Sequence, residues 1–402
     1  MIDRRDELIN ALIEAAEIEH GLMIQYLFPA LSMKKRLDEG ISAPQQRLIR
    51  GWERTLLGVA VDEMGHLGTV CNLLAAVGSG PRFSRPNFPQ ATGYYPFAFD
   101  LVRFGDEALY RMQVFELPRG EPLPPPPRRP PRPAAALLSV RTVAPDPLEY
   151  TYVGELYAQI RAGFAAISQA TLFIGPEAAQ VPSDWSVDLD MHQVTDRASA
   201  IAAIDDIIED GEGSPLTREG SHYDRFTKIR SAYGTAGLFD AARAVVPNPC
   251  TREHRGTQLG TLITNERSRA VAELFNGAYE CVLRMLQQFF AFGGETAGQR
   301  EALRLAAARL MSTAVRPIAE VLSELPAGDD AEPPRAGPGF ELYGDMTLSP
   351  YPDARWTILM ERLDVVVAEA VRLGAEIPRL GAVGETTGFV RRSIAAVTGG
   401  SG

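Results

Sequence analysis

The chain is poor in cysteine, in basic side chains and in long hydrophobic runs. Its three cysteines among 402 residues, Cys71, Cys250 and Cys281, are too scattered for a disulfide framework or a zinc knuckle, so we expect a reducing, cytoplasmic location. Lys and Arg number 40 against 51 Asp and Glu, and the net charge of -11 argues against nucleic acid or a membrane surface as a partner. No apolar run approaches the roughly 20 residues that span a bilayer. The start MIDRRDELIN is too charged for a signal peptide.

Apolar residues recur at helical spacing in several long segments, and no segment indicates a sizeable sheet. The segment from about 43 to 78 is the clearest, because Ser42 and Gln45 fit a capping box, Pro44 lies in the first turn and GSGP follows the end. The other predicted helices cover, approximately, residues 4–37, 148–168, 194–211, 262–292, 297–325 and 353–374.

A long irregular stretch, about 81–147, separates the second predicted helix from the third. Its run LPRGEPLPPPPRRPPRPAAA cannot form a regular helix or a central strand, because proline removes the amide donors that both need. We interpret the run as a spacer, and a docking segment for a proline-recognising partner is the alternative.

An acid and an imidazole occupy the apolar face of the helix predicted over 43–78. Its positions 52, 56, 59, 63, 66, 70, 73 and 77 step by three and four and hold Trp, Leu, Val, Glu63, His66, Val, Leu and Val. Because burying an unpaired charge is costly, inward Glu63 and His66 need partners. Glu-x-x-His is the unit with which helical bundles bind a pair of metal ions. A satisfied buried histidine and a functional acid without metal are the alternatives.

Three further acids and a second histidine extend this pattern. Glu19 lies on the apolar stripe of the first predicted helix, and Glu155 lies on that of the third. Glu212 follows the isoleucines of the fourth, and His222 comes ten residues later, beyond glycines that can turn the chain back. Glu209 is a further candidate ligand, with an exposed acid as its alternative.

The predicted metal ligands are therefore four acids and two histidines: Glu19, Glu63, His66, Glu155, Glu212 and His222. Four carboxylates balance the charge of two divalent cations, whereas without metal they would repel one another and take up protons. This inventory predicts two iron ions, with a mixed manganese–iron pair as the alternative, and no catalytic residue beyond the ligands.

Long helices with a long second connection predict an all-α chain, a ferritin-like four-helix bundle with an additional C-terminal helical region. The predicted boundaries are 1–230 for a di-metal bundle that carries the proline-rich insertion, and 231–402 for a helical extension packed on the bundle.

Several motifs resemble the ferritin-like family named after the iminophenyl-pyruvate dimer synthases of violacein- and rebeccamycin-type pathways. They are IEHGLMIQYLFPAL, VDEMGHLGTVCNLLAAVGSGPRF, YVGELYAQI, IIEDGEGS, SHYDRF, ELFNGAYECVLRML and AGPGFELY, which together cover most of the chain. The resemblance implies a ferritin-like bundle and places the family's motif residues on the same six positions. The pigment-pathway enzymes have a large additional N-terminal portion that this sequence does not include, and the proline run at 117–133 is not expected from them.

Residues and resemblance together lead us to expect an oxygen-dependent di-iron oxidase or oxygenase with dioxygen as co-substrate. The expected substrate is a small amino-acid-derived metabolite of secondary-metabolite biosynthesis, and the resemblance implies imine coupling, with a flavin amino-acid oxidase upstream. A homodimer is a further expectation, in which the segment AELFNGAYECVLRMLQQFF would form part of the dimer surface, and core packing is the alternative role of this segment. The alternatives are a ferroxidase or iron-storage protein with the same ligands, and a non-catalytic ferritin-like scaffold.

Overall fold

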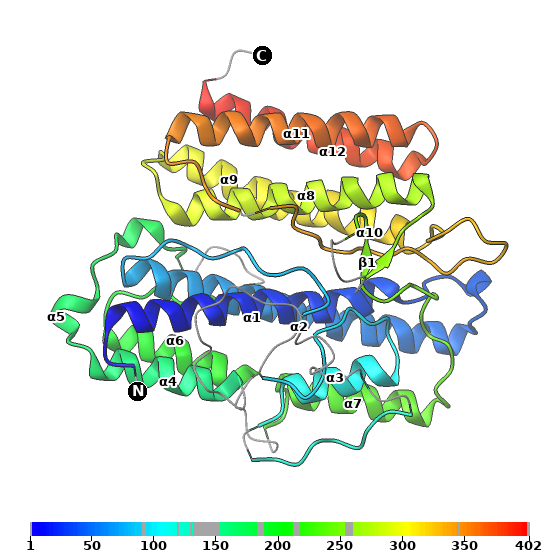
Figure 1. The fold of residues 1–402 in the computed structure, drawn as a ribbon, viewed down its shortest axis with the longest axis horizontal. Coiled ribbons are helices and arrows are strands. Elements are labelled where there is room, and N and C mark those ends of the chain that lie inside the picture. The colour runs from blue at the N-terminus through cyan, green and yellow to red at the C-terminus, as the bar shows by residue number, and fades with distance from the viewer. Residues whose placement is uncertain are drawn as a thin grey trace. The chain divides into compact units, whose positions relative to one another are not determined.

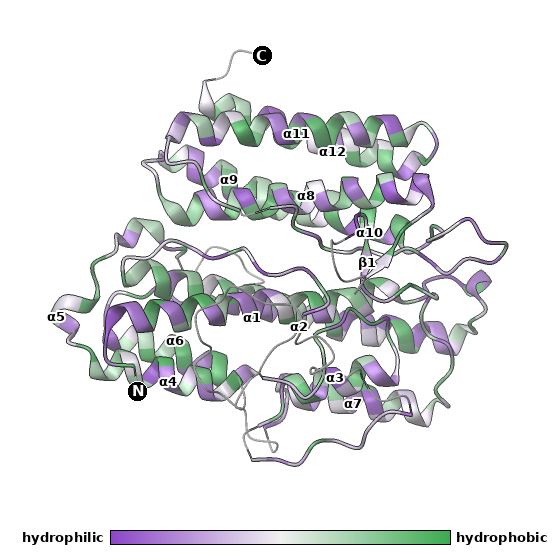
Figure 2. Ribbon diagram, viewed as in Figure 1, coloured by the Kyte–Doolittle hydropathy of each residue, from purple (hydrophilic) through white to green (hydrophobic). Residues whose placement is uncertain are grey.

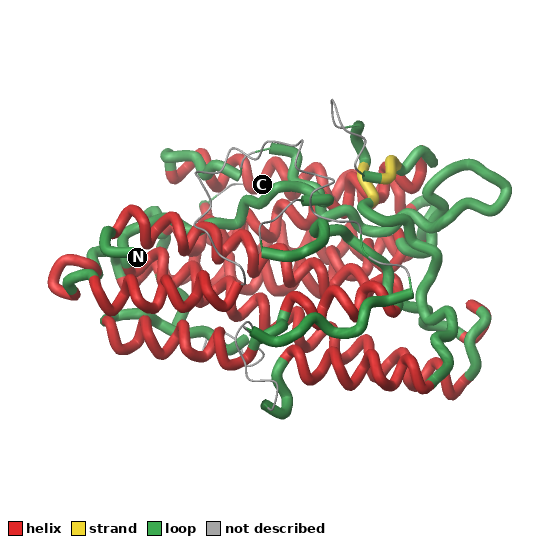
Figure 3. Tube along the Cα trace, turned by 60° about the horizontal axis from the view of Figure 1, so that its bottom comes forward, coloured by secondary structure: helices red, strands yellow, loops and turns green. Residues whose placement is uncertain are grey.

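The computed structural model describes residues 2–90, 94–118, 120–128, 131, 153–182, 189–211, 218–253, 260–344 and 346–399. The chain divides into two compact units, Met1–Arg243 and Ala244–Gly402. Helices make up nearly all the regular structure of the described residues (Figure 3), which confirms the predicted all-α class. None of these helices combines the length and the apolar character needed to cross a membrane.

Two long helices form the centre of the first unit. α1 (Arg5–Ser32) and α2 (Ala43–Ala76) pack against each other along their length (Figure 1), and the 3-10 turn η1 (Leu37–Glu39) lies in the connection between them. The predicted capping box is present, because the Ser42 hydroxyl accepts from the Gln45 amide while the Ser42 amide donates to the Gln45 side chain. Nearly every α1 side chain from Ile18 onward is buried, so a polar residue there must find its partner inside the protein.

Two rows of shorter helices complete the bundle. α3 (Asp106–Phe115) and α4 (Val153–Ala166) both pack against α1, whereas α6 (Arg197–Asp210) and α7 (His222–Thr235) both contact α2. α4 pairs with α6, and α3 pairs with α7. The third helix of a four-helix bundle is thus replaced by two short helices, α3 and α4, and the fourth by α6 and α7 (Figure 1). The rows are thus interrupted near the middle of the bundle. Short α5 (Gln169–Leu172) and η3 (Glu177–Ala179) lie in the connection from α4 to α6.

α3 corrects the prediction that residues 81–147 are irregular throughout. The helix begins with Asp106 and Glu107, acids that favour a helix N-terminus. It spans ten residues and ends before the proline run. Its apolar periodicity is therefore too short to distinguish it from the surrounding irregular sequence. α7, which begins at His222, was likewise not predicted. Residues 117–118 and 120–128 of the proline run form neither helix nor strand, as its prolines predict. The interpretation of the run as a spacer stays a prediction.

The second unit is also helical. α8 (Glu266–Ala291) packs against α9 (Ala297–Leu310) and α11 (Pro352–Gly374), and α12 (Pro378–Thr398) packs against both α9 and α11. Hydrophobic and hydrophilic residues are interleaved along α8 and α11 (Figure 2), as expected of helices that bury one face. The prediction of one helix over 297–325 corresponds to α9, a π-turn η4 (Met311–Val315) and α10 (Arg316–Leu322), while α12 was not predicted. Strands β1 (Pro249–Cys250) and β2 (Thr261–Leu262) form one short parallel pair.

Candidate metal centre

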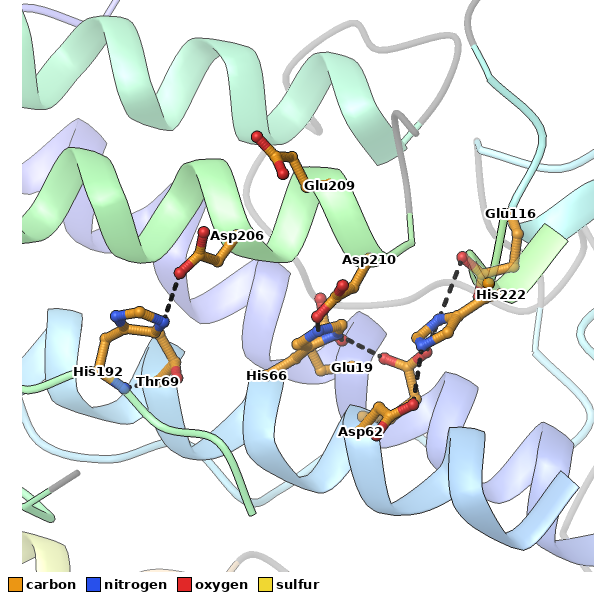
Figure 4. Close-up of polar contacts among 12 residues, drawn as sticks. Glu19, Asp62, His66, Thr69, Glu116, His192, Asp206, Glu209, Asp210 and His222 are labelled. Carbon is orange, nitrogen blue, oxygen red and sulfur yellow. Dashed lines mark hydrogen bonds and ion pairs between the residues drawn. The ribbon is translucent and has the colours of Figure 1, made fainter. Parts of the chain in front are cut away.

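Two groups of buried ligand atoms lie where the rows of short helices are interrupted (Figure 4). One group consists of Glu19 on α1 with Glu63 and His66 on α2. The other consists of Glu63, Glu116 directly after α3, and His222, the first residue of α7. The ligand atoms of each group lie within 4.8 Å of one another. Glu63 belongs to both groups and therefore lies between two candidate metal positions.

The two groups have matching geometry. One oxygen of Glu63 lies 3.1 Å from Nδ1 of His66, and the other lies 3.1 Å from Nδ1 of His222. Each Nδ1 is also 3.6 Å from a second carboxylate, that of Glu19 for His66 and that of Glu116 for His222. The imidazole ring centroids are 5.7 Å apart. Each position thus offers one histidine nitrogen, one carboxylate of its own and one oxygen of the shared Glu63.

Tyrosine hydroxyls fix the outer oxygens of the two unshared carboxylates. Tyr157 on α4 donates to Oε1 of Glu19, and Tyr26 on α1 donates to Oε1 of Glu116. In both residues Oε2 is the oxygen that faces the histidine. The tyrosines therefore orient one oxygen of each carboxylate toward a candidate metal position.

Aspartates face the outer nitrogens of the two histidines. Nε2 of His222 is 3.3 Å from Asp62, and Nε2 of His66 is 3.9 Å from Asp210. Arg225 in turn holds the Asp62 carboxylate at 2.7 Å. Asp62 is within hydrogen-bond distance, so it keeps the ring hydrogen of His222 on the outer nitrogen and leaves the Nδ1 lone pair for a metal ion. Asp210 is too distant for a hydrogen bond and acts on His66 through its charge.

The unsatisfied atoms of the centre fit metal ions. Oε2 of Glu19, Oε1 of Glu63, Oε2 of Glu116 and Nδ1 of His222 are buried and make no hydrogen bond among the described residues. Such atoms are costly in a protein interior unless something else satisfies them. Carboxylate oxygen and imidazole nitrogen are the donors that iron and manganese accept, so the residues present suit a pair of divalent cations.

Without metal, the centre would hold protons instead. Burial, together with the nearby charge of Glu63, raises the pKa of Glu19 to about 8. Burial also acts to raise the pKa of Glu63, but the facing imidazoles of His66 and His222 outweigh it and lower that pKa. Burial acts to lower the pKa of both histidines, yet the surrounding carboxylates raise it well above the usual histidine value. Protons therefore occupy the positions that metal ions would take.

The structure brings together four of the six residues that the sequence predicts as ligands: Glu19, Glu63, His66 and His222. Glu155 is half-buried on α4 and belongs to neither group, and Glu212 lies outside the described residues, so their role as ligands stays a prediction. Glu209 is largely exposed, and its carboxylate pairs with Arg218 at 3.0 Å.

Glu116 is the residue of the centre that sequence reasoning missed. It follows the short helix α3, inside a stretch predicted to be irregular. A weak signal was present, because Leu109, Met112 and Glu116 are spaced by three and four residues and so share one helix face. The signal extends over only two turns, which is too little to stand out among loops.

Replacing Asp62 with asparagine should weaken binding at the His222 position about 10- to 100-fold, because asparagine carries no charge to hold the outer ring hydrogen of His222. Titration with Co²⁺, followed by its visible absorption, measures this affinity. The matched control is Asp205→Asn on α6, since Asp205 pairs with Arg161 and contacts neither histidine. Equal affinity in Asp62→Asn and the unchanged protein would contradict the positioning role of Asp62.

Comparisons with known proteins agree with this architecture. The sequence model of the family described as ferritin-like matches residues 12–231, more than half of the chain. A dichlorochromopyrrolate synthase from Lentzea aerocolonigenes is 29% identical over 94% of this chain and 40% of its own length. A 2-imino-3-(indol-3-yl)propanoate dimerase from Chromobacterium violaceum is 26% identical over 86% of this chain and 35% of its own length. The chain thus spans two fifths or less of these relatives, whose names confirm the resemblance to the dimer synthases.

A solved structure supports the fold. A ferritin-like protein from Caulobacter vibrioides superposes with a TM-score of 0.51 and 18% identity, over 80% of this chain and 96% of that one. At this identity the likeness concerns the fold alone. With the family match, it leads to one conclusion: the chain belongs to the ferritin-like family.

Proposed function

We propose that the two ligand groups hold two iron ions and that the protein is an oxygen-dependent oxidase of secondary-metabolite biosynthesis. Its substrate would be a small imine derived from an amino acid, and its reaction the joining of two such molecules. The observation that carries the proposal is the buried carboxylate of Glu63 shared by two matching groups, since one ligand between two sites is what a coupled pair of ions requires. The substrate class is taken from the name of the dimerase relative.

The chain's own residues would hold and orient the ions. Two iron ions supply one-electron redox chemistry and the capacity to reduce dioxygen. Glu63 would keep them adjacent, while His66 and His222 fix one ion each. Tyr26 and Tyr157 hold the outer carboxylate oxygens, which restricts how far the carboxylates of Glu116 and Glu19 can turn.

The proposed reaction balances with dioxygen as the oxidant. Joining two imine molecules through a new carbon–carbon bond breaks one C–H bond in each and releases two electrons and two protons. One molecule of dioxygen accepts both and leaves as hydrogen peroxide. A flavin amino-acid oxidase acting upstream would supply the imine.

The test begins with metal-free protein loaded with Fe²⁺ under anaerobic conditions. We expect two ions per chain, a rise of several degrees in melting temperature because the metal binds only the folded state, and dioxygen consumption that increases when an amino-acid oxidase generates the imine in the same vessel. The metal-free protein with the same oxidase is the control. An unchanged melting temperature and no bound metal would contradict the proposal. Iron oxidation at the same rate with and without the imine would favour the ferroxidase alternative.

A further inference from the structure

A cavity of about 230 Å³ adjoins the candidate metal centre at His66. Among the described residues its charged lining is mostly acidic, with one guanidinium against four carboxylates: Arg218 against Asp190, Asp206, Glu209 and Asp210. The side chains of Asp206 and Asp210 are each more than half exposed, so solvent reaches the cavity. Both aspartates point from the last turns of α6 toward α2 (Figure 4).

The cavity distinguishes two otherwise matching metal positions. His66 lines it, whereas His222 does not, and only 1% of the His222 side chain is exposed. Asp210 lies 3.9 Å from the outer nitrogen of His66. On the inner side of the same ring, 3.6 Å from Nδ1, is the buried Oε2 of Glu19, which has no hydrogen-bond donor among the described residues. Carboxylates therefore extend from solvent to an unsatisfied ligand atom, Oε2 of Glu19, on the His66 side of the centre.

The chemistry of the lining favours a hydrated cation as occupant. An anion would meet four carboxylates, and the guanidinium that could bind it already contacts Glu209 at 3.0 Å and Asp210 at 3.4 Å. An aromatic ring would find few apolar walls, because Ile207 is the one aliphatic side chain in the part of the lining that the structure describes. At roughly 30 Å³ per water the cavity has room for about seven waters, enough for a divalent ion with its hydration shell.

We propose that this cavity is the route by which divalent metal cations reach the buried centre, so that the His66 position is filled and exchanged before the His222 position. The proposal rests on the metal centre of the proposed function. Its physical basis is electrostatic, because a cavity lined by charges of one sign concentrates ions of the other sign and raises their association rate.

The test compares loading rates of two double variants that remove the same charge. Asp206→Asn with Glu209→Gln neutralises the cavity at two side chains that are 55% and 63% exposed, where substitution is tolerated. Asp205→Asn with Asp38→Asn is the control, because these acids pair with Arg161 and Arg36 and do not line the cavity. Metal-free protein is mixed with Co²⁺ in a stopped-flow instrument, and the cobalt absorption is followed at low and high salt.

We expect the cavity variant to load about tenfold more slowly at low ionic strength, and the difference to shrink as salt screens the charges. The control should load at the wild-type rate, and all proteins should reach the same final cobalt content. Equal rates in the two double variants, or a slowdown that salt does not affect, would overturn the route. Competition by millimolar methylammonium at matched ionic strength would assign the cavity to an organic cation and overturn it as well. Failure of the wild-type protein to bind cobalt would instead refute the proposed centre.

Discussion

Glu63→Gln should abolish binding of both metal ions, whereas Glu19→Gln or Glu116→Gln should leave one position able to bind. The reason is that Glu63 contributes an oxygen to each group, while Glu19 and Glu116 each serve one. The amide of glutamine has nearly the shape of the carboxylate but lacks the charge that two cations require. Metal content after anaerobic loading and desalting measures the effect, and dioxygen consumption should disappear with the metal.

The control for this series is Glu53→Gln on the same helix, whose carboxylate pairs with Lys35 at 2.7 Å away from the centre. Helix content by circular dichroism shows whether each variant folds. If the folded Glu63→Gln variant kept its full metal content, this result would contradict Glu63 as a shared ligand and favour the non-catalytic scaffold. Glu155→Gln belongs in the same assay, because metal loss there would add Glu155 to the centre and retention would limit the centre to the residues of the two groups.

The part of the centre that could be predicted lies on the two long helices. Glu19 and Glu63 interrupt apolar stripes that continue for several turns on α1 and α2, so an inward acid stands out against its neighbours. His222 was predicted from its distance to Glu212 and from the intervening glycines, although the structure places it at the start of a separate helix. Its position is set by contacts with Glu63 and Glu116, which local sequence does not reveal.

The part that could not be predicted depends on contacts between distant segments. α3 has ten residues, too few for periodicity to separate it from the surrounding loop, and it is held by packing against α1 and α7. Glu116 enters the centre only because α3 ends opposite the start of α7. Likewise, nothing in the spacing of acids on α6 predicts that Asp210 faces His66, since that contact depends on how α6 packs on α2.

Metal binding should release protons and strengthen steeply as pH rises. In the metal-free protein the pKa of Glu19 is raised to about 8, so this carboxyl is protonated below pH 8. The pKa values of His66 and His222 are raised well above their ordinary value, so both imidazoles also carry an extra proton near neutrality. A metal ion needs the deprotonated form of each ligand. Each proton displaced by an ion makes its apparent affinity rise about tenfold per pH unit. Between pH 6 and 7.5 the affinity should therefore rise about 100-fold per unit at the His66 position, where Glu19 and His66 each lose a proton, and about tenfold at the His222 position.

Co²⁺ titrations at half-unit intervals of pH measure this slope, and a pH indicator in weakly buffered solution counts the protons released on loading. Glu19→Gln is the matched variant, because it abolishes binding at the His66 position, so that the protons of both Glu19 and His66 drop out and the count should fall by about two at pH 7. Tyr157→Phe, which removes the hydroxyl that holds Glu19 without removing the carboxyl, should keep the wild-type count. An affinity independent of pH over this range would mean that the buried acids and imidazoles are not where the metal binds. The direction of the slope therefore tests the same electrostatic arrangement from which the centre was inferred, without relying on catalysis.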